Sequence, residues 1–557
     1  MIETLTHHPE MALFLSLAVG YAIGAVKLGP VQLGGVCGTL IVALILGQTG
    51  VRLDPDLKNI AFALFIFALG FTGGPQFFAN IRQGWRFGIL SLVEVVVVMT
   101  VVLGATALLN LNPGAAAGLL AGSATESAVI GTAAEAVTHL PISAEEAVAL
   151  QGQIATAYSV TYLVGLITIV LFTSQFAPLL MRIDLKKEAA ALAQRMGESE
   201  ATAAAQAMPE LVGRAYLVGP AAGTTVGEFE AALGHNATIE RIASGGAVRD
   251  AHGEDRLRAG DVVMLVGRRA GVLEAAAKLG SEQRVPDALN MPLVSRDVVV
   301  ASGQVTGRPI RQLAQLAPLD IQRGIYISRV RRMGHDIPVL PDTQIQNGDV
   351  VTLYGAERSV VRAARELGRM VEVGDRTNFV MIGVGILVGI LIGLLGVTIA
   401  GIRISLGTGG GCLLSGLVFG WLATRRTGAW NFPSSAAQIL KDFGLATFIA
   451  AVGLSAGPDA IRLIKEYGLT LPVAGMLAAL LPALCSLFVG RKFLKIEAPF
   501  LLGAIAGQQC STPAISAVTA AAGNSTPVVG YTVTYAISNV LLPLLGPVVV
   551  GVAANMS

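Results

Sequence analysis

Long apolar segments constrain this chain more than any other feature of its sequence. A helix needs about 20 mostly apolar residues to cross the hydrocarbon core of a bilayer. Segments near that length are residues 11–27, 33–50, 59–79, 87–109 and 150–178 in the first half, and 377–398, 404–423, 437–457, 468–490 and 526–553 in the second. The sequence therefore predicts an α-helical membrane protein with about five spans in each half.

A polar module separates the two apolar halves. Charged residues make up 14% of the chain, against about 25% in a soluble domain, and they concentrate in residues 183–375. The expected parts are an N-terminal membrane half (1–182), a linker helix (183–206), two α+β domains (207–284 and 285–375) and a C-terminal membrane half (376–557).

Repetition within the polar module suggests the two α+β domains. Residues 260–267 (GDVVMLVG) parallel residues 348–355 (GDVVTLYG), and the helical segment that follows ends at Gly280 in one copy and at Gly368 in the other. A Gly-Asp turn, a β-rich run and an amphipathic helix closed by glycine are typical of an α+β unit.

The two membrane halves also resemble one another in three blocks that occur in the same order. The pairs are Asn59–Pro75 with Asp442–Pro458, Gly118–Ile130 with Gly503–Ile515, and Tyr158–Tyr162 with Tyr531–Tyr535. Shared low-complexity usage of Ala, Gly and Val is the alternative explanation. An odd number of spans in each half inverts the second copy, and inverted repeats with interrupted segments near the midplane are typical of secondary transporters.

Basic residues in short loops favour the cytoplasmic side and so predict an orientation. Segments 113–137 and 497–522 are rich in small residues and have polar centres. If both are re-entrant hairpins, Arg182, Lys186 and Lys187 lie inside, the 183–375 module is cytoplasmic and both termini are periplasmic. If both are full spans, these three residues lie outside, so the hairpin interpretation is preferred.

The centres of these two segments are the first candidate site. Polar backbone at membrane depth persists only where protein buries it or water reaches it. The candidate substrate-binding residues there are Ser123, Thr125, Glu126, Ser127, Gln508, Gln509, Cys510, Ser511 and Thr512. Opposed half-helix N-termini can hold a carboxylate. Close packing of small residues is the structural alternative.

Acidic and aromatic residues extend this site. Glu126 and Glu94 are carboxyl groups within apolar segments, where an ionisable group is a functional candidate. Glu126 is expected to bind a substrate ammonium group or a proton. The alternative is that Glu126 lies at the outer mouth of the site, in contact with water. Glu94 is expected to carry a proton or to pair with a basic residue. Polar stripes on the last span of each half are a second candidate lining, with an interfacial aromatic belt as the alternative. They are Tyr158, Thr161 and Tyr162, and Tyr531, Thr534, Tyr535 and Asn539.

Arginines flank several spans, and most are expected to be topological anchors. Arg82 follows the Gly-Gly-Pro break at residues 73–75 and is the candidate clamp for a substrate carboxylate. The glycine run 407–411 lacks the lysine and spacing of a phosphate loop, so it indicates close helix packing. Four cysteines and six histidines give no metal-ligand spacing, and no catalytic residue, metal or cofactor is expected.

The chain resembles the aspartate:alanine exchanger (AspT-like) family over nearly its whole length. The resemblance rests on FALFIFALGFTGGP and GLATFIAAVGLSAGP, on the AGSATES and AGQQCSTPA tips, and on the central pair of units, which look like TrkA-C domains. It implies electrogenic exchange of L-aspartate for L-alanine, or of related amino acids or dicarboxylates, across the bacterial inner membrane. The first tip departs from the family pattern at Glu126-Ser127-Ala128, where a Thr-Pro-like pair is expected.

Three classes of function remain in view. The first is an antiporter in which a mobile part with both hairpins moves past a scaffold, in an elevator-like manner, and the TrkA-C-like pair dimerises or binds a small regulatory ligand. The second is a cation or proton transporter regulated by those domains, although no TVGYG-like filter is present. The third, a membrane enzyme, has no motif in its favour. The expected partners are the substrate, the bilayer and a second copy of the chain, and not nucleic acid.

Overall fold

The structure is a computed structural model that forms two compact units. The membrane unit comprises Met1–Ala190 and Asp375–Ser557, and the polar unit comprises Ala191–Gly374. The residues that the structure describes are 5, 7–28, 31–32, 34–197, 211–233, 237–284, 293–316, 324–371, 377–399, 402–405, 407–425 and 432–556.

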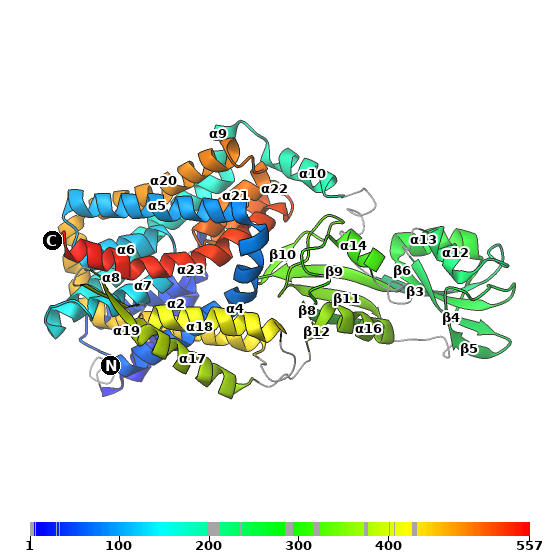
Figure 1. Cartoon of the computed structure of the whole chain (residues 1–557), viewed down its shortest axis with the longest axis horizontal. Helices are drawn as coiled ribbons and strands as arrows, with labels where there is room; N and C mark the ends of the chain where they lie inside the picture. Colours follow the sequence, from blue (N-terminus) through cyan, green and yellow to red (C-terminus); the bar gives the residue numbers. More distant parts are fainter. Residues whose placement is uncertain are drawn as a thin grey trace. The chain divides into compact units, whose positions relative to one another are not determined.

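The membrane unit is built from helices of both halves of the sequence (Figure 1). The first half contains α2 (Pro9–Gly24), α3 (Gly35–Gly47), α4 (Pro55–Gln83), α5 (Trp85–Leu109), α6 (Pro113–Ser123), α7 (Ala128–Val137), α8 (Ala144–Leu171), a π-helical turn at Phe172–Phe176, α9 (Ala177–Met181) and α10 (Leu185–Arg195). The second contains α17 (Phe379–Leu394), α18 (Gly407–Arg425), α19 (Ser434–Tyr467), α20 (Thr470–Lys492), α21 (Ala498–Gln508), α22 (Thr512–Ala522) and α23 (Thr526–Ala554).

Six of the described helical segments are long and apolar enough to cross a bilayer. They are Pro55–Phe78, Trp85–Leu109, Ala144–Met181, Ser435–Ser455, Thr470–Lys492 and Thr526–Ala554. The other predicted spans correspond to the shorter helices α2, α3, α17 and α18. Large apolar side chains are exposed on α5, α17 and α20, as at Val96, Leu387 and Phe488, and a bilayer would cover them. The protein is therefore a multi-pass membrane protein.

Two short β-hairpins differ from the predicted spans. The span predicted at 377–398 ends as a helix at Leu394, and Gly396–Ile399 (β13) instead pairs antiparallel with Ile402–Ser405 (β14). Lys27–Leu28 (β1) pairs in the same way with Val31–Gln32 (β2), beyond the end of α2. Residues 396–405 (GVTIAGIRIS), which include β13 and β14, are rich in β-branched residues, and these favour strands. Because the same residues are apolar, the predicted span continues past the residue at which the helix ends.

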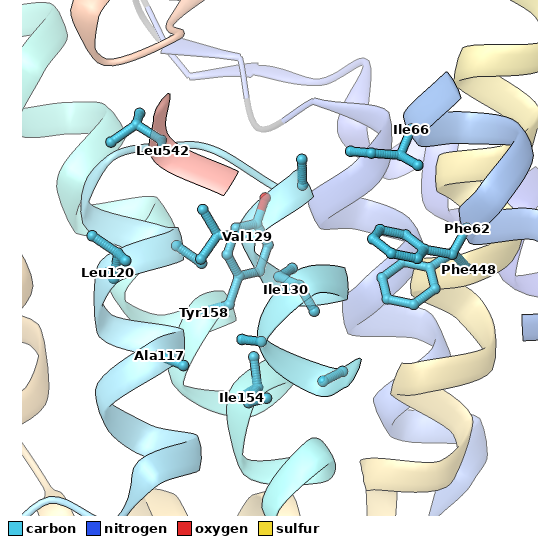
Figure 2. Close-up of a cluster of buried hydrophobic side chains, with 14 of the residues drawn as sticks. Phe62, Ile66, Ala117, Leu120, Val129, Ile130, Ile154, Tyr158, Phe448 and Leu542 are labelled. Carbon is cyan, nitrogen blue, oxygen red and sulfur yellow. The ribbon is translucent and has the colours of Figure 1, made fainter. Parts of the chain in front are cut away.

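The two polar-centred segments each form a pair of short helices. Asn112 caps α6 by accepting the Ala115 N–H at 2.9 Å, and Ser511 caps α22 by accepting the Ala514 N–H at 3.3 Å. Helix α6 packs on α7 and helix α21 packs on α22, with breaks at residues 124–127 and 509–511. Figure 2 shows the first pair, with Leu120 on one arm, Val129 on the other and the turn between them.

The helices of the membrane unit pack in two groups. The hairpin group consists of α5–α8 and α20–α23, in which α6 packs on α8, and α21 on α23. The flanking group consists of α2–α4 and α17–α19, in which α4 packs on α18 and α19. The groups meet mainly where α8 contacts α19, α23 contacts α4 and α7 contacts α18. Both polar-centred segments therefore belong to the same group.

The polar unit contains two antiparallel sheets with the same strand order. The first, in the order β5-β4-β6-β3-β7, consists of β3 (Leu211–Leu217), β4 (Ala237–Ser244), β5 (Ala247–Asp250), β6 (Val262–Arg268) and β7 (Glu282–Gln283), with helices α12 (Val226–Ala231) and α13 (Arg269–Leu279). The second, in the order β10-β9-β11-β8-β12, consists of β8 (Leu293–Val300), β9 (Ile325–Arg332), β10 (His335–Ile337), β11 (Val350–Ala356) and β12 (Gly368–Met370), with helices α14 (Ile310–Leu316) and α16 (Glu357–Leu367).

The repeated Gly-Asp turns precede β6 and β11, as the sequence predicts. Asp261 accepts the Arg258 N–H at 3.1 Å, and Asp349 accepts the Gln346 N–H at 2.8 Å. Asp349 also accepts two bonds from the Arg332 guanidinium, from Nε at 2.8 Å and from Nη2 at 2.7 Å. The side chains of both Arg332 and Asp349 are buried, so the second sheet contains a desolvated ion pair.

Candidate functional site

The two tips share one backbone geometry. Thr125 and Cys510 both adopt a left-handed conformation with φ of 49°. The next residue in each tip donates its N–H five residues back, from Glu126 to the Ala121 carbonyl at 2.9 Å and from Ser511 to the Ala506 carbonyl at 3.1 Å. Non-glycine residues rarely hold this conformation, and such strain concentrates at functional sites.

The tips also touch each other. The Thr125 hydroxyl donates a hydrogen bond to the Gln509 carbonyl, across 384 positions of sequence. The Cys510 thiol forms a hydrogen bond with the Glu126 carboxylate, and the Asn539 amide donates to Cys510 Sγ at 3.4 Å. The two loops that the sequence predicts at matching repeat positions therefore lie together inside the membrane unit.

Glu126 stands at the centre of this contact. Its Oε1 accepts the Ala128 N–H at 3.0 Å, so the carboxylate lies at the N-terminus of α7, where the helix dipole favours negative charge. Glu126 as a whole is 5% exposed. The aligned position in the second tip, Ser511, caps α22 with a neutral hydroxyl. Only the first tip therefore contributes a carboxylate at this position.

Tyrosines of α8 and α23 border the tips. The Tyr158 hydroxyl lies 2.8 Å from Ser127 Oγ, and Tyr531 forms a hydrogen bond with the Thr512 side chain. Figure 2 shows the Tyr158 ring beside Val129 and Ile130, with its hydroxyl oxygen directed toward the turn. The Tyr162 ring lies beside that of Tyr158, with the ring centroids 5.1 Å apart. The Tyr535 ring lies beside that of Tyr531 in the same way, with the centroids 5.0 Å apart.

Three other predicted residues have structural partners. Thr161 donates to the Gly118 carbonyl at 3.2 Å, and Thr534 donates to the Ala504 carbonyl at 2.7 Å, so both fasten a hairpin arm to the neighbouring helix. Ser123 donates to the Leu120 carbonyl of its own helix at 3.2 Å. These hydroxyls support the packing interpretation of the small-residue segments, whereas Thr125 and Ser127 face the other tip and Tyr158.

The glutamines hold the second tip in place. The Gln508 amide donates to the Leu90 carbonyl on α5, and the Gln509 amide donates to the Ala479 carbonyl on α20 at 3.3 Å. Glu94 lies one turn from Leu90 on α5 and accepts from the Ser538 hydroxyl at 3.4 Å. Glu94 is 1% exposed, and its Oε1 has no hydrogen-bond partner among the residues that the structure describes. Glu94 therefore borders the second tip.

Lys441 is a site residue that sequence reasoning missed. It lies on α19 within a candidate span, is partly buried, and interacts electrostatically with Glu126. Its neighbour Asp442 is exposed and interacts with Tyr535. Lys441 immediately precedes the repeated block Asp442–Pro458, so the similarity between the two halves does not include it.

Two other expectations concern Arg82 and metals. The side chain of Arg82 lies outside the described residues, so its role as a carboxylate clamp stays a prediction. Among the residues that the structure describes, no group of three or more His, Cys, Asp or Glu side chains is arranged to hold a metal ion. The glycine run 407–411 does pack closely, since a Cβ at Gly411 would meet backbone atoms of Gly389 and Gly393.

Replacing Gly122 or Gly507 by Ala is expected to lower the free energy of unfolding by about 1–3 kcal/mol. A Cβ at Gly122 would lie 2.7 Å from the Tyr162 nitrogen, and one at Gly507 would lie 3.0 Å from the Tyr535 nitrogen. The matched control is Gly104→Ala on exposed α5, where the new Cβ meets nothing within 4 Å. Hydrogen exchange of peptides from α6, α8, α21 and α23 in the full-length protein measures the effect, and equal protection in all three variants would contradict it.

The sequence of this chain is similar to a family model and to several transporters. A family model described as a predicted permease membrane region, Asp-Al_Ex, matches residues 12–178 and 381–551. An uncharacterised transporter of Zymomonas mobilis is 36% identical over 556 residues, covering 98% of each chain. An uncharacterised transporter of Bordetella parapertussis is 36% identical over 564 residues, covering 99% of this chain and 98% of its own. No solved structure matches.

Proposed function

Because this chain belongs to the aspartate:alanine exchanger (Asp-Al_Ex) family of permeases, and is a membrane transporter rather than an enzyme, we propose that it is a secondary antiporter for amino acids. The proposed exchange is L-aspartate for L-alanine, or for related amino acids or dicarboxylates, across the bacterial inner membrane. The observation that carries the proposal is the contact between the two polar tips inside the membrane unit, at Thr125 and Gln509.

Charges at the tips suit an amino acid. The Glu126 carboxylate provides a partner for a substrate ammonium group, and Lys441 provides a partner for a carboxylate. The N-termini of α7 and α22 lie at the two tips, and the positive ends of their helix dipoles favour a second carboxylate there. Together these groups recognise a zwitterion with or without an acidic side chain.

A common site for both substrates gives the exchange its electrical character. Aspartate carries one net negative charge at neutral pH and alanine carries none. When the site alternately carries each of them across the membrane, each cycle moves one net charge. The proposed exchange is therefore electrogenic, and its rate depends on membrane potential.

The helix groups suit an elevator-like movement. Both tips belong to the hairpin group, and α8 and α23, which border the tips, belong to it as well. Movement of this group past the flanking group would carry the site from one side to the other without taking the tips apart. Segments interrupted near the midplane, one from each half of an inverted repeat, are typical of such carriers.

We propose that the polar unit is cytoplasmic and regulatory. The equal strand order of its two sheets agrees with a tandem of TrkA-C-like domains that dimerise two copies of the chain. A cavity between the two domains is lined by Thr238, Glu240, Ala251, His252, Arg358, Ser359 and Arg362. Its mixture of carboxylate, hydroxyl and guanidinium groups suits a small polar ligand.

Exchange in proteoliposomes tests this function. Vesicles loaded with alanine are expected to take up labelled aspartate, whereas empty vesicles are not, and an imposed membrane potential is expected to change the rate. Absence of exchange for every amino acid and dicarboxylate tested would refute the proposal. Potassium or proton flux without an organic substrate would instead support the cation-transporter alternative.

A further inference from the structure

Polar contacts between the two helix groups gather at one face of the membrane unit. Face A is the side where α4, α8 and α18 begin and α19 ends; face B is the opposite side, where α19 and α23 begin. At face A, Lys58 Nζ donates to Gln151 Oε1 at 2.9 Å, and the Asn112 amide donates to the Tyr467 hydroxyl at 3.3 Å. Glu135 accepts the N–H groups of Thr408 and, at 2.8 Å, Gly409. These bonds join the hairpin group to the flanking group at face A.

The Lys58 contact reaches a hairpin arm. Lys58 is a partly buried residue near the start of α4, in the flanking group, and Gln151 lies on α8, in the hairpin group. The Gln151 amide also donates to the Ala134 carbonyl on α7 at 2.8 Å. The glutamine therefore joins the lysine to the first hairpin, and breaking this contact would free the hairpin group at face A.

The second half of the sequence repeats this lysine and this amide. Lys58 immediately precedes the block Asn59–Pro75, and Lys441 immediately precedes its counterpart Asp442–Pro458. Gln151 stands seven residues before Tyr158, and Asn524 stands seven residues before Tyr531. Because α19 and α23 begin at face B, Lys441 and Asn524 are placed to form the corresponding contact at that face.

The second pair is disengaged in this structure. The Asn524 Oδ1 accepts the Thr526 N–H at 3.1 Å and the Thr526 hydroxyl at 2.7 Å. Lys441 interacts instead with Glu126 and Asp442, and Asp442 is exposed. One lysine–amide pair is thus closed while its repeat counterpart is apart, as expected for a carrier closed at face A.

We propose that Lys58–Gln151 and Lys441–Asn524 are alternating latches, the first closing face A and the second closing face B. The inference rests on the proposed function, since it assumes that the hairpin group moves. A lysine within a membrane span needs a polar partner, so each latch compensates its own lysine when closed. Equal chemistry at both faces keeps the two conformations close in free energy, which lets a small substrate shift the balance between them.

Thiol cross-linking in the full-length protein tests the latches. The variants are Lys58→Cys with Gln151→Cys, and Lys441→Cys with Asn524→Cys, each in vesicles treated with a short bismaleimide, because a contact between the ends of two long side chains spans more than a disulfide can. Coupling of a maleimide polymer to the denatured protein then counts the thiols left free, so each cross-link removes two mass steps relative to the untreated variant. The first pair, which lies outside the substrate site, is expected to cross-link without substrate and to cross-link more slowly when aspartate and alanine are both present.

A single-residue change gives an independent readout. Lys58→Gln in the Lys441→Cys/Asn524→Cys variant is expected to speed cross-linking of the second pair about tenfold or more, because a hydrogen bond from a charged group to Gln151 is lost. Lys187→Gln, on an exposed surface of α10, is the control and is expected to leave the rate unchanged.

Two results would overturn the latches. One is cross-linking of both pairs in the same molecule of the variant that carries both introduced pairs beside the four natural cysteines. The other is failure of the second pair to cross-link in any condition, the Lys58→Gln background included, while the wild-type protein exchanges amino acids. Cross-linking of the second pair when the wild-type protein exchanges no amino acid or dicarboxylate would keep the latches and refute the proposed substrate, so the two proposals fail separately.

Discussion

Glu126→Gln is expected to lower the initial rate of aspartate–alanine exchange about 100-fold while leaving the protein folded. Glutamine keeps the shape of the side chain and an oxygen for the Ala128 N–H, but it removes the charge that binds a substrate ammonium group. It also removes one of the two carboxylates that interact electrostatically with Lys441, the other being Asp442. Removing one partner of a desolvated charge pair costs about 2–5 kcal/mol, or roughly 30-fold to several thousand-fold.

Matched variants separate the site from general damage. Glu145→Gln, in the exposed first turn of α8, is expected to leave the exchange rate unchanged. If Glu126 and Lys441 act as a pair, Lys441→Gln lowers the rate as well, and the double variant loses less than the sum of the two single losses. Near wild-type exchange by Glu126→Gln, with normal expression and thermal stability, would contradict the role of this carboxylate.

The sequence located the tips because their chemistry conflicts with their surroundings. Hydroxyl, amide and carboxyl groups inside an apolar segment have few structural explanations, and two such segments at matching repeat positions have fewer. The contacts of Thr125 with Gln509 and of Ser127 with Tyr158 involve residues that this reasoning had selected. The same reasoning did not distinguish Thr161 and Thr534, whose hydroxyls bond to backbone carbonyls of the hairpin arms.

Other features depend on contacts that no single segment encodes. In the sequence, nothing distinguishes Lys441 from other basic residues near the ends of spans. Its interaction with Glu126 arises only in the folded protein. Glu94 looks isolated among valines and leucines, yet Ser538, 444 positions away, donates to it. The hairpin β13–β14 was missed for another reason, because apolarity alone does not separate a buried strand from a helix.

The polar unit shows the same contrast between a repeated motif and its partners. Both Gly-Asp turns were predicted from sequence, and both aspartates accept a backbone N–H three residues back. The Arg332 guanidinium that binds Asp349 comes from a neighbouring strand, which the local pattern does not reveal. Two turns with the same motif are therefore expected to differ in how much they stabilise their sheets.

Asp349→Ala is expected to lower the stability of the second sheet by about 3–5 kcal/mol, because it leaves the buried Arg332 charge without its counter-ion. The Arg332 Nη2 keeps its bond to the Gln344 carbonyl at 2.8 Å, which does not neutralise the charge. Asp261→Ala in the first sheet is the control, with an expected loss of about 1–3 kcal/mol from one backbone bond.

Hydrogen exchange of the full-length protein gives the measurement, since a chain with two compact units does not unfold in one step. Peptides from β9 and β11 should lose protection in Asp349→Ala, whereas peptides from β4 and β6 should not. Replacing the pair together, as Arg332→Met with Asp349→Leu, removes both charges and is expected to restore most of the lost protection. Equal losses in Asp349→Ala and Asp261→Ala, or no gain in the double variant, would show that the ion pair does not stabilise this sheet.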